Sequence, residues 1–114
     1  MARTLKTQWY YILLALAGGD RHGLAIAREV ATLSDGRTRL WPAMLYGSLE
    51  DLCGRGWIEE LADARRRPPQ ESERRRYYRI TRAGRAALAA ETERMAGIVR
   101  IARSRIKPRA GESS

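Results

Sequence analysis

The sequence predicts a mainly helical α+β domain with a core of three helices, a two-stranded hairpin and a long last helix. Three observations predict it. Apolar residues recur at helical spacing in four segments, two short strand-like segments lie between the third and fourth of them, and glycine or proline stands at most of the boundaries. With 114 residues, the chain is long enough for one hydrophobic core and too short for two.

The first helix is expected over residues 5–17 and ends before Gly18, because glycine adopts the left-handed conformation that terminates helices. Residues 9–17 are apolar on nearly every side, so this helix needs cover on more than one face. We expect the core to cover one face and a partner subunit to cover the other. Trp9 and Leu13 would then contact the partner.

Two further helices complete the predicted core. The second is expected over residues 23–33, where Leu24, Ala27, Val30 and Leu33 recur at helical spacing. The third begins at Pro42, since a proline at the first helical position lacks only an N–H that has no helical partner there, and it ends near Arg55. Its buried stripe consists of Leu45, Leu49 and Leu52, with Cys53 at the edge.

Two short strands are expected on either side of a loop of about ten residues that contains two prolines. Ile58 on one strand and Tyr78 and Ile80 on the other face the core. Thr81 then caps the last helix with its hydroxyl, and this helix is expected to span 82–107.

Three helices, a strand, a loop, a strand and a last helix, in this order, form a winged helix-turn-helix. We therefore expect a DNA-binding domain at residues 1–81, a dimerisation helix at 82–107 and a disordered tail at 108–114. The last helix carries apolar residues at alternating spacings of four and three, which is typical of lengthwise packing on another helix. A small core cannot cover a helix this long, so a homodimer is favoured over packing within the chain. The residues of this seam are Leu88, Thr92, Met95, Val99, Ala102 and Ile106, widened by Ile98 and Ile101.

The charge indicates an anionic partner. The formal net charge is +9 and 20 of the 22 basic residues are arginine, whose planar fork suits phosphate and guanine. Nucleic acid is the first candidate and an acidic membrane surface the second. A single cysteine excludes a disulfide framework and fits the cytoplasm. The basic start and the apolar run that follows imitate a secretory signal, but we interpret the run as the most apolar helix of the domain.

The third helix is unusually bare on the face opposite its leucines. It presents Ala43 and Gly47 there, with Met44 and Tyr46 on the flanks. Such a slim face lets a helix enter a major groove about 12 Å wide while the flanking side chains reach the base edges. The alternative is that Gly47 permits close packing against another helix.

Positive charge is expected beside this helix rather than on it. Arg37 and Arg39 precede it, and residues 65–79 hold seven arginines against two glutamates. A hairpin loop with arginines on both shoulders suits a phosphate backbone or an adjacent minor groove, although charge runs are often simply solvated. The wing residues expected to contact DNA are Arg65, Arg66, Arg67, Arg74, Arg75 and Arg76.

The sequence contains no constellation typical of an enzyme. His22 is the only histidine, so a multi-histidine metal site is not possible, and we expect neither a Ser/His/Asp set nor a cofactor. We interpret His22 as a residue of the turn that leads into the second helix.

Three segments resemble the PadR family of bacterial winged-helix transcriptional regulators over about residues 8–95: "ILLALAGGDRHGLAIAREV", "WPAMLYGSLEDLCGRGWIEE" and "RRRYYRITRAGRAALAAE". The resemblance implies a nucleoid-associated homodimer that binds a palindromic operator in double-stranded DNA, usually as a repressor of a neighbouring gene. It also implies that Tyr46 contacts DNA. Some relatives bind flat aromatic compounds between the first and last helices. That would place an effector beside Trp9, Tyr10 and Tyr11, although interface aromatics more often serve packing.

Three residues depart from the family pattern, and one of them is Ala43, which stands where glycine is common. Trp41 stands before the proline, where a small or hydroxylated residue is usual, and Met44 stands where serine or threonine is common. Trp41 cannot cap the helix as serine would, and Met44 cannot hydrogen-bond a phosphate. The alternative from another functional class is a protein-interaction module whose basic wing contacts an acidic partner protein.

Overall fold

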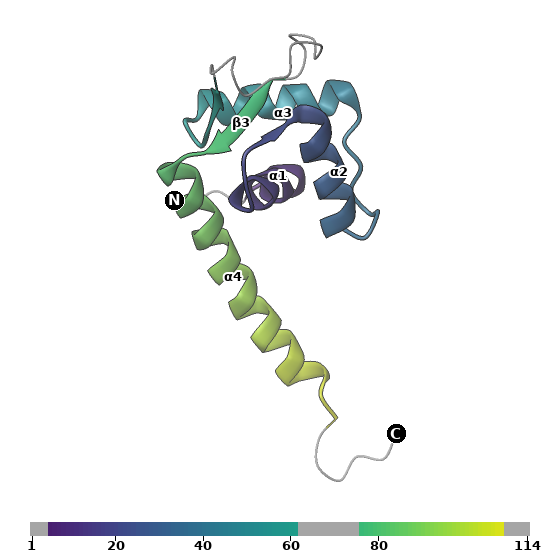
Figure 1. Ribbon diagram of the computed structural model, residues 1–114. Coiled ribbons are helices and arrows are strands. Elements are labelled where there is room, and N and C mark those ends of the chain that lie inside the picture. The colour runs from purple at the N-terminus through teal and green to yellow at the C-terminus, as the bar shows by residue number, and fades with distance from the viewer. Residues whose placement is uncertain (1–4, 62–75, 109–114) are drawn as a thin grey trace.

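The computed structural model describes residues 5–61 and 76–108 (Figure 1). In chain order the elements are α1 (Thr7–Ala17), β1 (Arg21–His22), α2 (Gly23–Leu33), α3 (Pro42–Gly54), β2 (Ile58–Leu61), β3 (Tyr77–Ile80) and α4 (Arg82–Ile106). This arrangement confirms the mainly helical, winged helix-turn-helix class, and the four helices begin and end close to the expected residues. The tail at 109–114 lies outside the described residues.

The sheet has three strands where the sequence predicted two. Its order is β1-β3-β2 and both pairs are antiparallel, with Arg21 opposite Tyr78 and His22 opposite Tyr77. A strand of two residues contains no alternation for a sequence pattern to reveal. His22 also caps α2, because its Nδ1 accepts a hydrogen bond of 3.1 Å from the Ala25 N–H. It therefore leads into the second helix as expected, but as the last residue of β1 and not as part of a turn.

The core lies between the first three helices and the sheet. The three leucines of α3 and the strand residues expected to face inward are buried: Leu45, Leu49, Leu52, Ile58, Tyr78 and Ile80. The second helix differs from expectation, since Ile26 and Val30 are buried whereas Leu24 and Leu33 are 46% and 40% exposed. Two apolar stripes overlap on α2, and contact with α1 selects the one that carries the β-branched residues.

α1 is the central helix of the protomer. It contacts α2, α3, α4 and β3, so much of its surface is covered within its own chain. Leu13 is fully buried, and Trp9 is 7% exposed, packed edge-to-face on Trp57 with 6.2 Å between the ring centroids. Arg55 lies over the Trp9 ring at 4.6 Å. Trp9 and Leu13, expected at a subunit interface, therefore lie inside the protomer.

The first turn of α4 is fixed to the turn that follows α3. The Thr81 hydroxyl accepts a hydrogen bond of 3.1 Å from the Gly84 N–H and donates one of 2.6 Å to the Gly56 carbonyl. The Thr81 N–H donates to the Trp57 carbonyl at 3.0 Å. The same carbonyl lies against Gly84, and a Cβ at that position would collide with it. From this attachment α4 extends away from the end of the molecule where α3 lies (Figure 1).

Candidate nucleic-acid interface

The described residues leave the outer face of α3 open. Ala43, Met44, Tyr46 and Gly47 are all exposed, and no atom lies within 4 Å of where a Cβ on Gly47 would stand. Gly47 therefore does not serve close packing against another helix of the described chain, which was the alternative interpretation of this glycine. The bare face remains free for a partner outside the protomer.

Tyr46 has a fixed support on the flank of this face. A Cβ on Gly23, the first residue of α2, would lie 2.9 Å from the Tyr46 hydroxyl oxygen and 3.2 Å from its ring carbon Cε1. The Tyr46 ring thus packs over the α2 backbone while 42% of the residue stays exposed. Sequence reasoning missed the role of Gly23. The only indication in the sequence was that glycine, a poor helix former, stands at the first position of the predicted second helix.

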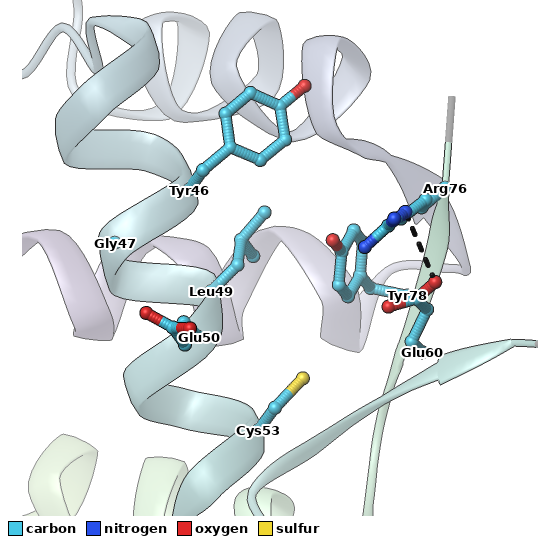
Figure 2. A pocket seen from close by; sticks show the side chains of 8 residues that line it. All are labelled: Tyr46, Gly47, Leu49, Glu50, Cys53, Glu60, Arg76 and Tyr78. Atoms are coloured by element: carbon cyan, nitrogen blue, oxygen red, sulfur yellow. Dashed lines mark ion pairs between the residues drawn. The ribbon is translucent and has the colours of Figure 1, made fainter. Parts of the chain in front are cut away.

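A cavity of about 430 Å³ separates α3 from the base of the wing. Figure 2 shows Tyr46 and Leu49 on α3 facing Tyr78 and Arg76 across it. Arg76 forms an ion pair of 3.5 Å with Glu60, drawn as the dashed line. This pair joins the two strands where they lead into the wing, next to the open face of α3.

Burial and nearby acid keep two groups of this cavity neutral. Burial raises the pKa of Tyr78 to about 12, and the Glu60 carboxylate adds to the shift. Burial also raises the pKa of the Cys53 thiol, again with help from Glu60. A thiol with a raised pKa is protonated near neutral pH and is a poor nucleophile. The cavity therefore offers hydrogen-bonding and apolar surface, and no activated nucleophile.

The arginines expected to contact DNA fall into two groups. Arg37 and Arg39 are exposed in the segment before α3, and Arg76 is exposed directly before β3. Arg65, Arg66, Arg67, Arg74 and Arg75 lie outside the described residues. Arg79, from the same basic run, serves the fold, since its guanidinium binds the Asp20 carboxylate at 3.0 Å and ties β3 to the end of the α1–β1 connection.

α4 divides into an attached half and an exposed half. Leu88 is buried in the core, and Thr92 is joined to α1 because its hydroxyl donates to the Leu88 carbonyl (2.8 Å) and accepts from the Tyr10 hydroxyl (2.7 Å). Met95 is half-buried. Beyond it the exposed apolar residues are Ile98, Val99, Ile101, Ala102 and Ile106. Leu88 thus packs inside the protomer, and the open part of the predicted seam is its C-terminal part.

A second cavity, of about 290 Å³, lies between α1 and α4. Tyr10 and Tyr11 line it, with Leu5, Thr7, Glu91, Arg94 and Met95. Trp9, grouped with these tyrosines in the sequence, turns into the core instead. The Arg94 guanidinium binds the Glu91 carboxylate at 2.6 Å, and this hydrogen bond lowers the pKa of Glu91. Of the three aromatic residues expected at an effector site, Tyr10 and Tyr11 therefore line a cavity and Trp9 does not.

Within residues 5–61 and 76–108, no three histidine, cysteine or acidic side chains are grouped so that they could hold a metal ion. None of the helices in the same part of the chain is both long enough and apolar enough to cross a membrane.

The chain is similar to known transcriptional regulators in sequence and in structure. The model of the transcriptional regulator PadR-like family matches residues 12–90. No protein of curated function matches the chain by sequence. Among solved structures, a transcriptional regulator from Clostridium thermocellum is similar, with a TM-score of 0.68 and 24% identity over 88% of this chain and 90% of that one.

Two further structures resemble the chain. RosR from H. salinarum has a TM-score of 0.67 and 27% identity, covering 85% of this chain and 79% of its own. BpsR from Bordetella bronchiseptica, whose DNA binding is regulated by 6-hydroxynicotinic acid, has a TM-score of 0.67 and 18% identity over 92% of this chain and 70% of its own. At 18% and 24% identity, the likeness to BpsR and to the Clostridium regulator shows the fold alone.

Proposed function

Because the chain belongs to the transcriptional regulator PadR-like family, we propose that it is a dimeric repressor that binds a palindromic operator beside a neighbouring gene. Members of this family are regulators and not enzymes. The observation that carries the proposal is the open face of α3, flanked by Tyr46 and set beside the base of the wing. In this scheme the protein acts on chromosomal DNA in the cytoplasm.

The shape of α3 and the positive charge around it make different contributions to DNA binding. Ala43 and Gly47 keep the helix slim enough to enter a major groove, and Tyr46 reaches base edges or sugars from its supported position. The helix itself carries Glu50 and Asp51, so the attraction to phosphates comes from Arg37, Arg39 and the wing arginines. Specificity and affinity then reside in different elements.

The exposed half of α4 supports the dimeric part of the proposal. Its large apolar residues, Ile98 and Val99 among them, are 46% or more exposed, and a second copy of the helix would cover them. In a twofold dimer the two α3 helices read two half-sites, and the packing of α4 sets the distance between them. Thr92 and Met95 lie at the start of this seam, next to the domain.

The cavity between α1 and α4 is the proposed effector site. Tyr10 joins the two helices through Thr92, so a flat aromatic compound beside Tyr10 and Tyr11 would alter how α4 meets the domain. A change in that angle changes the spacing of the half-sites and releases the operator. We use 6-hydroxynicotinic acid as the first probe, since it regulates a structural neighbour. The compound should raise the melting temperature of the wild type and not that of Tyr11→Ala. An equal rise in both proteins would refute the proposed effector site.

Binding to DNA is tested by its salt dependence. Fluorescence anisotropy would compare a duplex from upstream of the gene with a random duplex of equal length between about 50 and 200 mM salt. About six phosphate contacts give a log–log slope near −5. The alternative function, contact with an acidic protein, predicts no preference for the upstream duplex, and that outcome would refute the repressor.

A paired change tests the wing. Arg75→Ala with Arg76→Ala should weaken binding to both duplexes and make the salt slope shallower by about two, because two phosphates are no longer neutralised by the protein. Arg103→Ala is the matched control, because this arginine is exposed on α4, which extends away from α3. An equal effect of both changes would mean that general charge, and not the wing, drives binding.

A further inference from the structure

Trp41 is the most exposed large aromatic side chain of the described residues. It stands at the N-cap of α3 with 67% of its surface exposed, whereas Trp9 is 7% exposed and Trp57 is half-buried. Its backbone carbonyl accepts the Leu45 N–H at 2.8 Å, but its side chain makes no capping hydrogen bond. The indole therefore contributes nothing to helix capping, and its apolar surface faces water.

Trp41 closes one side of a groove of about 240 Å³ on the outer surface of α2. Leu24, Ala27 and Ala31 of α2 contribute apolar surface to it. Leu24 is 46% exposed, whereas Ala27 is partly buried and packs against the core. The groove is thus an apolar surface that the described residues leave open.

Two cations complete the lining of this groove. Arg28 comes from α2 and Arg39 from the segment before α3, and none of the described residues that line the groove is acidic. Both arginines are exposed. A suitable occupant must therefore present anionic groups and apolar surface in alternation.

A DNA strand has this chemistry, because phosphates alternate with deoxyribose rings along it. A second copy of the chain at this groove would bring two pairs of arginines together, which disfavours self-association. The first helix of a helix-turn-helix crosses the DNA backbone while the second enters the groove, and Trp41 lies where α3 begins, beside α2. The position of the groove and its positive charge therefore both favour a DNA strand as its occupant.

We propose that the groove formed by Trp41, Leu24, Arg28 and Arg39 seats one strand of the bound duplex. The indole packs on a deoxyribose, and the two arginines bind the flanking phosphates. The inference rests on the proposed function. Where a serine would hydrogen-bond one phosphate, Trp41 supplies an apolar contact that salt does not screen.

Fluorescence tests this contact directly. Acrylamide quenching of wild-type protein would be measured alone, with the upstream duplex, and with a random duplex at low salt. Trp41→Phe defines the signal of the other two tryptophans. Bound DNA should shield Trp41 from acrylamide. If DNA binds and the quenching of Trp41 is unchanged, the inference is wrong while the proposed function stands. If neither duplex binds, both the inference about the groove and the proposed function are wrong.

Affinity measurements separate the apolar contact from the charged ones. Trp41→Ala should weaken binding about tenfold with an unchanged salt slope, whereas Arg28→Gln should reduce the slope by about one. Leu33→Ala is the matched control, because this leucine is 40% exposed on α2 and does not line the groove. Two results overturn the inference: equal affinity of Trp41→Ala and wild type, or shielding of Trp41 that appears without DNA as protein concentration rises.

Discussion

The ring of Tyr46 in α3 lies over the backbone of Gly23 at the start of α2, so that a Cβ on Gly23 would come within 2.9 Å of the Tyr46 hydroxyl oxygen. The first residue of one helix thereby fixes the direction of a side chain on the next. Because Tyr46 flanks the open face of α3, the packing of the two helices and the proposed reading of DNA depend on the same contact.

Replacement of Gly23 by alanine should affect DNA recognition more than folding. The added methyl group meets the outer part of the Tyr46 ring and no backbone, so the ring can swing aside, and a helical alanine offsets part of the strain. We expect the free energy of unfolding to change by less than about 1 kcal/mol. Affinity for the operator should fall about tenfold with little change for random DNA.

Tyr46→Ala is the reference for this experiment, since it removes the displaced ring altogether. The two variants should lose specificity to a similar degree in anisotropy titrations, and the double variant should be no worse than Tyr46→Ala alone. Additive losses would show that Gly23 acts on DNA binding by a route independent of Tyr46.

Much of the fold follows from the sequence because its signals are local. Pro42 marks the start of α3, Thr81 caps α4, and the leucine spacing of α3 identifies its buried face. The choice between two apolar stripes on α2 is not local, because only contact with α1 decides it. The burial of Trp9 and Leu13 inside the protomer was not predicted for the same reason: the length of a chain cannot show that four elements contact one helix.

The phenol of Tyr78 should ionise only at strongly alkaline pH. Burial raises its pKa to about 12 from the usual 10, so the fold favours the neutral form. The unfolded chain ionises first, and the stability that Tyr78 contributes is therefore full below pH 10 and lost as the pH rises towards 12. Ultraviolet titration of the wild type should show a phenolate that forms near pH 12, and Tyr78→Phe should remove it. Identical titration curves for the two folded proteins in that pH range would contradict the assignment.

The candidate site shows which features of a sequence carry information about partners. The bare face of α3 could be recognised because Ala43 and Gly47 oppose a clear leucine stripe. The groove beside Trp41 could not, since it joins residues of α2 to the segment before α3 and depends on Leu24 being outside the core. In the sequence, Trp41 stands out only as a departure from the family pattern.

Gly84→Ala should destabilise the protein strongly. A Cβ at this position collides with the Trp57 carbonyl and would lie 2.8 Å from Ile80 Cγ1, and backbone that is hydrogen-bonded to Thr81 cannot yield as a side chain can. We expect a loss of about 3 kcal/mol in urea denaturation. Gly97→Ala is the matched control in the same helix, because its nearest neighbour would be the Arg100 guanidinium at 3.8 Å. It should stabilise α4 by up to about 1 kcal/mol.

Val99→Asp should convert the proposed dimer to monomers. Val99 is 46% exposed on the apolar seam of α4, beyond the part of the helix that packs on the domain, so a charge there costs the protomer little and would be buried unpaired in a dimer. Sedimentation velocity should show a monomer, and operator binding should fall to that of a single half-site. Ser104→Asp adds the same charge on a different face of α4, at an exposed position, and should remain dimeric. If both variants stay dimeric, the subunits meet elsewhere than along α4.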